Sequence, residues 1–364
     1  MILPPTEILL KWPPPDYETP ETRGSSLLVA SSIFTAFAAV AVALRLYARI
    51  FITRWFGIDD VLICFALLFT IGTNVTVDLG ISKYGWNRHT WDVPIEWIDG
   101  SLKLAYATKI LFLIAANATM VSLLAFYYRL ITDVNIRWFR LALSSSIAFN
   151  LICWIVFLVL QIVPCIPISA FWKVSTEAPC ADEGTVLVAG GVVKTFIDVL
   201  VTTLPIPLIL SMKLRPQQRY GLVVLLALGY IVTAAGALRT YYTWKVFHNP
   251  LWDYSWYYYP AFLASAVEND LAVICACVPA MRPLLRPIFG PFGGMLSKVH
   301  SFWKTKSTRS SSVLSSGRPP TSIFRSPKSP HAITSKTAIV SDEEHGHLVL
   351  QELSGVTIGL THRQ

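Results

Sequence analysis

Seven long apolar runs, separated by shorter polar stretches, fill the chain between about residues 25 and 290. Each run is close to the roughly 20 residues that an α-helix needs to cross the hydrocarbon core of a bilayer. Stretches such as 223–228 are continuously apolar, whereas a transmembrane β-barrel needs short segments of strict alternation. The pattern predicts membrane-spanning helices at about 27–48, 58–79, 104–130, 140–162, 186–210, 220–243 and 257–281.

Composition agrees with this pattern. The chain is 54% apolar and 14% charged, with a mean hydropathy of +0.53, which excludes an ordinary soluble domain. We therefore expect an all-α membrane protein, a bundle of seven transmembrane helices in residues 25–290. Residues 1–24 are proline-rich and lack the basic start and apolar core of a signal peptide, so the first span must act as the insertion signal.

The distribution of lysine and arginine predicts the orientation of the bundle. Basic residues gather in the loops after the first, third and fifth spans: Arg45, Arg49, Arg54, Arg129, Arg137, Arg140, Lys213, Arg215 and Arg219. By the positive-inside rule these loops are cytosolic, which places the N-terminus outside and the C-terminus inside. Residues 291–364 are rich in Ser and Thr, are basic near the membrane and have little apolar periodicity, so we expect a disordered cytosolic tail.

Two of the six cysteines fall in one predicted outer loop. Cys165 and Cys180 lie between the fourth and fifth spans, on the oxidising side, and a disulfide between them would hold this loop over the bundle. Two reduced thiols are the alternative. Cys275 and Cys277 have no paired His or Cys at ligand spacing, so we predict no metal site.

Ionisable residues inside the spans are candidate functional groups, because burying a charge in a membrane is unfavourable. Lys194 and Asp198 are one turn apart in the fifth span, which fits either an internal ion pair or a ligand or proton site. Arg239 is a counter-charge for Glu268 only if the bundle lets it reach inward; otherwise it extends toward the membrane surface. The remaining candidates in the last span are Asn269 and Asp270.

The angular positions of these acids constrain where they point. Glu268 and Asp270 are about 200° apart around an ideal helix, so they cannot both face one cavity. At least one of the two should point at a neighbouring helix or be protonated.

A second group of charged residues marks the predicted cytosolic face: Arg45, Arg49, Asp59, Asp60, Arg129 and Arg282. The two aspartates begin the second span, where carboxylates complement the helix dipole and can pair with arginines across the turn. This arrangement fits either a structural clamp or a docking surface. Arg129 ends the third span, where it either couples to a partner or extends to the membrane surface, and Arg282 anchors the end of the last span.

These blocks, in this order, resemble the fungal rhodopsin-domain integral membrane proteins, the family that includes Pth11-like receptors and satratoxin-cluster membrane proteins. The resemblance is carried by Arg45 to Asp60, the loop from Gly80 to Trp91, Ser122 to Arg129, Asp198 to Pro207, Arg239, and Glu268 to Pro283. It implies a seven-helix, receptor-like membrane protein of a filamentous fungus. One departure is Met120, at a position where family members often carry a lysine.

Retinal chemistry is excluded for the last helix, because the run from about Tyr259 to Met281 contains no lysine to form a Schiff base. We expect no cofactor and no nucleic-acid partner. The sequence contains no soluble-enzyme motif, so it does not favour an enzyme.

The preferred interpretation is a receptor or sensor in the plasma membrane, with an internal membrane as the alternative location. Its expected partners are the lipid bilayer, a small apolar ligand and a cytosolic signalling protein. The main alternative is a membrane-embedded enzyme or accessory protein of a secondary-metabolite pathway, in which Glu268, Asp270 or Asp198 acts as an acid.

Overall fold

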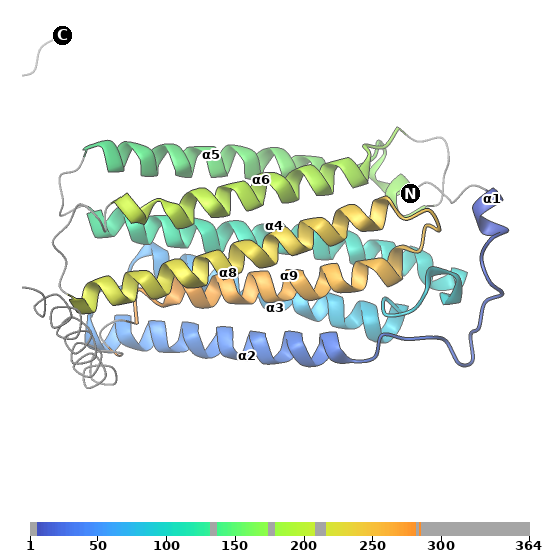
Figure 1. Ribbon diagram of the computed structural model, residues 1–364, viewed down its shortest axis with the longest axis horizontal. Coiled ribbons are helices and arrows are strands. Elements are labelled where there is room, and N and C mark those ends of the chain that lie inside the picture. Colours follow the sequence, from blue (N-terminus) through green and yellow to red (C-terminus); the bar gives the residue numbers. More distant parts are fainter. Residues whose placement is uncertain (1–5, 132–136, 174–178, 208–215, 282–283, 285–364) are drawn as a thin grey trace, which may run out of the picture. The chain divides into compact units, whose positions relative to one another are not determined.

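A computed structural model describes residues 6–131, 137–173, 179–207, 216–281 and 284. Among these residues seven helices are long and apolar enough to cross a membrane. They are α2 (Ser26–Tyr47), α3 (Ile58–Tyr84), α4 (Ile95–Ile131), α5 (Arg137–Ile162), α6 (Glu183–Thr203), α8 (Pro216–Phe247) and α9 (Tyr254–Cys277), and they run side by side (Figure 1). The predicted tail at 291–364 lies outside the described residues.

Short helical turns connect or precede these helices. They are α1 (Thr6–Leu9), the π-helical turn Ala48–Ile52 after α2, and the 3-10 turns Thr90–Asp92 and Ile168–Phe171. The described residues contain no β-sheet, only two isolated bridges, between Thr22 and Arg88 and between Cys165 and Cys180. The predicted all-α architecture is therefore confirmed for this part of the chain.

Most helix ends lie within a few residues of their predicted positions, but the start of the third span does not. Helix α4 begins at Ile95, nine residues before the predicted start at 104. Its first turns carry Glu96, Asp99 and Lys103, which lower the hydropathy without opposing the helix. Lys103 pairs with Asp99 at 2.7 Å, one turn away on an exposed face, which supports the helix locally.

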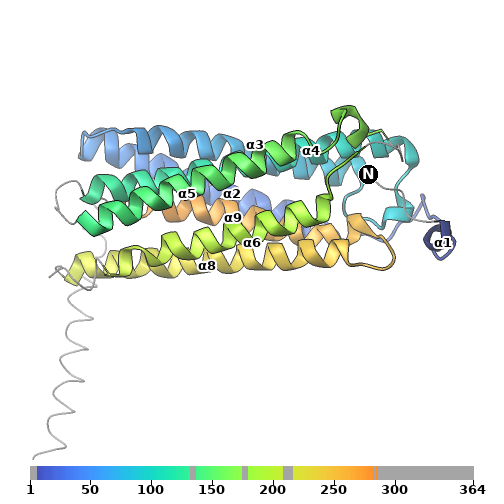
Figure 2. The ribbon, with the colours of Figure 1, turned by 90° about the horizontal axis from the view of Figure 1, so that it is seen from above.

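Helix α9 lies in the middle of the bundle, as two perpendicular views show (Figures 1 and 2). It packs against α2, α3, α4 and α8. The three consecutive polar residues Glu268, Asn269 and Asp270 are all buried in it. Because successive side chains are 100° apart, these three sweep about 200° of the helix surface, and only a helix surrounded by protein keeps them all from lipid.

Glycines allow α6 and α8 to approach closely. A Cβ atom on Gly191 would lie 2.6 Å from the Thr240 hydroxyl oxygen, and one on Gly229 would lie 2.7 Å from a Thr202 methyl carbon. Small residues at such contacts are typical of helices packed in membranes. The close contact brings the polar residues of α6 near those of α8 and α9.

The two ends of the bundle differ in what closes them. We call the end with Trp86–Asp92, Cys165–Cys180 and Trp252–Tyr254 the loop end, and the end with Arg45, Asp59 and Arg129 the arginine end. At the loop end the predicted disulfide is present, joining Cys165 and Cys180 with an S–S distance of 2.03 Å. The functional candidates divide between a cavity that reaches the loop end and a buried cluster at the arginine end.

Candidate functional site

A cavity of about 860 Å³ lies inside the bundle and reaches the loop end. Residues of α3, α4, α5, α6, α8 and α9 line it, and this volume is within the range of small-molecule sites. Much of the wall is aromatic: Trp86, Trp91, Phe112, Trp154, Phe157, Phe171, Phe247, Tyr258 and Phe262. An apolar molecule therefore finds mostly apolar contacts here.

The segment before the first span contributes to the same wall. Trp12 and Pro13–Pro15 line the cavity. The Trp12 indole Nε1 donates to the Leu251 carbonyl oxygen at 2.8 Å, and its ring lies 5.9 Å from that of Trp91. These contacts hold the N-terminal segment against the loops before α4 and α9.

Four ionisable side chains meet beside the cavity. The Lys194 ammonium group donates to Asp198 Oδ2 at 2.9 Å and to Glu268 Oε1, and Arg239 Nε donates to Glu268 Oε2 at 2.6 Å. Lys194, Asp198 and Arg239 line the cavity, whereas Glu268 lies behind them with none of its surface exposed. We call these four residues the cavity cluster.

Two contacts of the cavity cluster bear on alternatives that the sequence left open, while a ligand or proton site at Lys194 and Asp198 stays a prediction. Lys194 and Asp198 form the predicted pair within α6, and Arg239 reaches inward to Glu268. A glycine in α8 makes room for this contact, since a Cβ atom on Gly236 would lie 3.2 Å from Glu268 Oε1. The pair of Lys194 and Asp198 follows from spacing within α6. The contacts of Lys194 and Arg239 with Glu268 require that α6, α8 and α9 be neighbours, which no local pattern in the sequence specifies.

Asp270 belongs to a different polar group, as its angular distance from Glu268 predicts. Its Oδ2 atom accepts hydrogen bonds from the Thr35 hydroxyl at 3.2 Å and from Asn74 Nδ2 at 3.1 Å. These residues connect α9 to α2 and α3. Asn269 is also buried, and its Nδ2 has no hydrogen-bond partner among the described residues.

Sequence reasoning missed two polar pairs in the cavity wall. Lys109 pairs with Glu183 at 2.5 Å, and Asn150 donates to Asn117 at 2.8 Å. Lysine and asparagine inside apolar runs were a usable signal, but their partners are on other helices.

Helix α6 begins at Glu183, the partner of Lys109, and its start is capped by Asp182. Its carboxylate accepts hydrogen bonds from the Thr185 hydroxyl and from the backbone N–H groups of Thr185 and Gly184. These bonds lower the pKa of Asp182, with the hydroxyl contributing most. The charged cap satisfies N–H groups that a helix start leaves without partners.

A histidine joins two loops at the loop end. His89 Nδ1 shares a hydrogen bond of 2.6 Å with Asp253 Oδ2, and the same carboxylate accepts from the Thr90 backbone N–H at 2.9 Å. The imidazole is stacked between Trp91 and Trp256, with ring centroids 4.5 and 3.9 Å away. The loop before α4 is thereby attached to the loop before α9.

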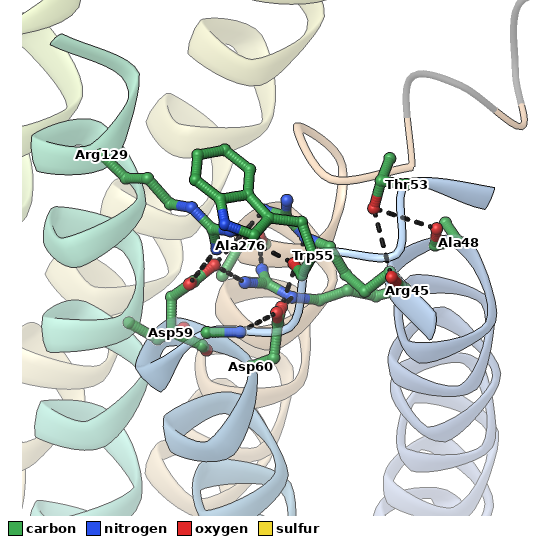
Figure 3. Close-up of polar contacts among 11 residues, drawn as sticks. Arg45, Ala48, Thr53, Trp55, Asp59, Asp60, Arg129 and Ala276 are labelled. Atoms are coloured by element: carbon green, nitrogen blue, oxygen red, sulfur yellow. Dashed lines mark hydrogen bonds and ion pairs between the residues drawn. The ribbon is translucent and has the colours of Figure 1, made fainter. Parts of the chain in front are cut away.

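The arginine end is closed by a second cluster, drawn in Figure 3. Arg45 is completely buried, and all three of its nitrogens donate: Nε to Asp60 at 2.8 Å, Nη2 to Asp59 at 2.6 Å and Nη1 to the Ala276 carbonyl oxygen at 2.7 Å. One guanidinium group therefore joins α2, α3 and α9. Of the two interpretations given by the sequence, this geometry fits the clamp.

Two further arginines complete this cluster. Arg49 Nη2 lies 3.3 Å from Asp59 Oδ2, and Arg129 Nη1 donates to Asp59 Oδ1 at 2.9 Å, which adds α4. The Arg129 guanidinium also lies over the Trp55 indole, 3.6 Å from the ring centroid (Figure 3). Arg129 is thus engaged by the protein itself. We call Arg45, Arg49, Asp59, Asp60 and Arg129 the clamp; Arg282 lies outside the described residues.

In the described part of the chain, no group of three or more His, Cys, Asp and Glu side chains is placed to hold a metal ion.

Comparison with known proteins matches the model of the "Fungal rhodopsin domain" to residues 44–287. "Wortmanamides biosynthesis cluster protein C" of Talaromyces wortmannii is 28% identical over 85% of this chain and 85% of its own. "Receptor GIN3" of Arthrobotrys oligospora is 26% identical over 69% of this chain and 60% of its own. "Satratoxin biosynthesis SC1 cluster protein 4" of Stachybotrys chartarum is 28% identical over 52% of this chain and 65% of its own. No solved structure matches the chain significantly.

Proposed function

Because the chain belongs to the fungal rhodopsin domain family, we propose that this multi-pass membrane protein is a receptor-like sensor that binds an apolar ligand inside its bundle. The observation that carries the proposal is the aromatic cavity of about 860 Å³, with the cavity cluster in its wall. Similarity to a protein named as a receptor supports it. The last helix offers no lysine for a retinal Schiff base, so we propose a ligand other than retinal and no resident cofactor.

We further propose that the arginine end faces the cytosol and the loop end the exterior, in the plasma membrane or in an internal membrane. The basic residues of the clamp support this orientation by the positive-inside rule. A ligand then enters from outside or from the bilayer, and a cytosolic signalling protein reads the arginine end.

Helices α3, α4 and α9 each connect the cavity to the clamp; α3 lines the cavity and carries the two aspartates of the clamp. Helix α9 carries Glu268 beside the cavity and Ala276, whose carbonyl oxygen binds Arg45, about 12 Å further along at 1.5 Å per residue. Helix α4 carries Lys109 in the cavity wall and ends near Arg129. A ligand that shifts any of these helices changes the hydrogen bonds of the clamp, which supplies a physical route for coupling.

The test is to delete the gene in the fungus that carries it and to measure transcription with and without surface and nutrient cues. Complementation with Arg129→Met should fail to restore the response, because the group that ties α4 to Asp59 is lost while most of the clamp remains. Arg140→Met, an exposed substitution on α5, is the matched control and should restore it. A deletion strain whose transcriptional response is unchanged would exclude the receptor role.

A second candidate function is an enzyme or accessory protein of a secondary-metabolite pathway, and the names of two relatives favour it. Of the three acids considered for catalysis, Asp198 lines the cavity, whereas Glu268 and Asp270 do not. An enzyme would therefore depend on Asp198. Under this alternative, deletion changes the metabolite profile, purified protein converts a pathway intermediate, and Asp198→Asn abolishes the conversion.

A further inference from the structure

Arg239 presents unused hydrogen-bond donors to the cavity. Its Nε binds Glu268, but no described residue accepts a hydrogen bond from Nη1 or Nη2. The residue is only 9% exposed and lines the cavity, with its guanidinium 5.0 Å from the Phe112 ring centroid. A nearly buried guanidinium that keeps donors free beside a cavity can donate them to an acceptor that enters it. A ligand with a hydrogen-bond acceptor is therefore expected at this position.

The formal charges around the cavity favour a ligand without a net charge. Lys194 and Arg239 are balanced by Asp198 and Glu268, and Lys109 is balanced by Glu183. The wall, together with Glu268 behind it, thus carries no net formal charge among the described residues. A carboxylate would add an unbalanced negative charge to a buried apolar site, which is unfavourable. A neutral oxygen acceptor satisfies Arg239 without that penalty.

The cavity is elongated. Its lining runs along α6 from Glu183 to Asp198, a rise of about 22 Å, and along α4 from Ile98 to Met120, about 33 Å. A sphere of 860 Å³ would be only about 12 Å across, well below either length. The site therefore fits a long, narrow molecule better than a compact one.

We propose that the cavity binds an uncharged, elongated apolar molecule whose carbonyl-type oxygen, as in an ester, amide or ketone, accepts hydrogen bonds from Nη1 and Nη2 of Arg239. This inference rests on the proposed function, since it names the ligand class of the same site. It identifies Arg239 as the residue that selects the head group, while the aromatic wall contacts the chain.

The experiment uses three probes that share a sixteen-carbon skeleton and differ at one end: methyl palmitate, hexadecane and palmitate. Each is added at equal mole fraction to the full-length protein in lipid nanodiscs, and thermal unfolding is measured across a concentration series. Methyl palmitate should bind about tenfold or more tightly than hexadecane, because its carbonyl satisfies a charged donor. Methyl palmitate should also bind more tightly than palmitate, because the carboxylate of palmitate adds an unbalanced charge.

Substitutions at Arg239 and at a control position test whether the preference for methyl palmitate depends on Arg239. Arg239→Lys keeps the positive charge beside Glu268 but removes the two free nitrogens, so methyl palmitate should bind no better than hexadecane. Arg140→Lys is the matched control, an exposed arginine on α5, and should retain the preference. If Arg239→Lys does not fold, the order of affinity of the three probes for the unaltered protein tests the proposed ligand class.

Each result bears on a different statement. Equal binding of methyl palmitate and hexadecane, or a preference for palmitate, overturns the head-group assignment and leaves the receptor proposal standing. No shift with any probe overturns the elongated ligand class. The receptor proposal is decided separately, by the response of the gene-deletion strain.

Discussion

The clamp and the cavity cluster contain the same kinds of side chain, buried in one bundle, yet they use their hydrogen-bond donors differently. In the clamp, every nitrogen of Arg45 donates to an acceptor from the protein, and its side chain has no exposed surface. In the cavity cluster, Arg239 lines the cavity and donates through Nε alone, since no described residue accepts from its Nη1 or Nη2. A closed set of hydrogen bonds fits a structural role, whereas an incomplete set beside a cavity fits a binding role.

Burial of charge does not by itself identify a functional site. Asp59 and Glu268 are both almost fully buried and both bind cationic side chains. They differ in their surroundings, since protein encloses the first and a cavity adjoins the second. Substitutions in or beside the two clusters should therefore have different consequences.

The largest effect is expected for Arg45→Leu. The substitution leaves Asp59 and Asp60 buried with Arg49 and Arg129 as their remaining cations, and it frees the Ala276 carbonyl oxygen. Removing one partner from a buried ionic network typically destabilises by about 3–5 kcal/mol. Thermal unfolding of the purified protein in detergent measures this loss, with exposed Arg140→Leu as the control. A change no larger than that of the control would show that the clamp is not structural.

A smaller loss, about 2 kcal/mol, is expected for Glu268→Gln, because Lys194 retains Asp198 and the glutamine amide oxygen still accepts a hydrogen bond. The same unfolding measurement applies. The difference between this variant and Arg45→Leu expresses the contrast between the two clusters as a free energy. If Glu268→Gln is as damaging as Arg45→Leu, the cavity cluster is a second clamp.

Within the clamp, Arg129→Met should destabilise by only about 1 kcal/mol. Asp59 keeps Arg45 and Arg49, and the lost ion pair and cation–π contact with Trp55 are partly exposed. Stability should thus survive while the cellular response is lost. A stability loss close to that of Arg45→Leu would mean that Arg129 belongs to the structural part of the clamp.

The smallest effect is expected for Gly236→Ala, beside the cavity cluster. The added Cβ lies 3.2 Å from Glu268 Oε1, a tight contact that offsets the gain of up to about 1 kcal/mol in helix propensity. We expect a net change within about 0.5 kcal/mol in either direction. Gly57→Ala, beside the clamp, should be worse, because its Cβ would lie 2.5 Å from Arg129 Nη1 and 2.6 Å from Asp59 Oδ1. Equal changes in stability for Gly236→Ala and Gly57→Ala would show that the two clusters are packed equally tightly.

The sequence predicted the helices well because membrane spanning is a local property. Each span must be about 20 residues long and mostly apolar, and both conditions can be counted along the chain. Hydropathy did not locate the start of α4, because Glu96 and Asp99 lower it there although the backbone remains helical. Hydropathy locates the part of a helix that lies in lipid and says less about the part beyond it.

Pairing between helices was predictable only where the chain itself brought residues together. Arg45 and Asp60 flank one short turn, so their contact follows from local geometry. Lys194 and Glu268 are 74 residues apart, and their contact depends on which helices are neighbours. The same holds for Lys109 with Glu183. The angular argument still separated Glu268 from Asp270, because it needed one helix alone.

The position of Trp12 has a consequence for how selectivity varies among related proteins. The family match begins at residue 44, but Trp12 and Pro13–Pro15 are part of the cavity wall. Two relatives alike throughout the matched region can therefore present different entrances to the same interior. Exchanging residues 1–25 between them should transfer part of their ligand preference, which makes the segment before the first helix a natural target for redesigning specificity.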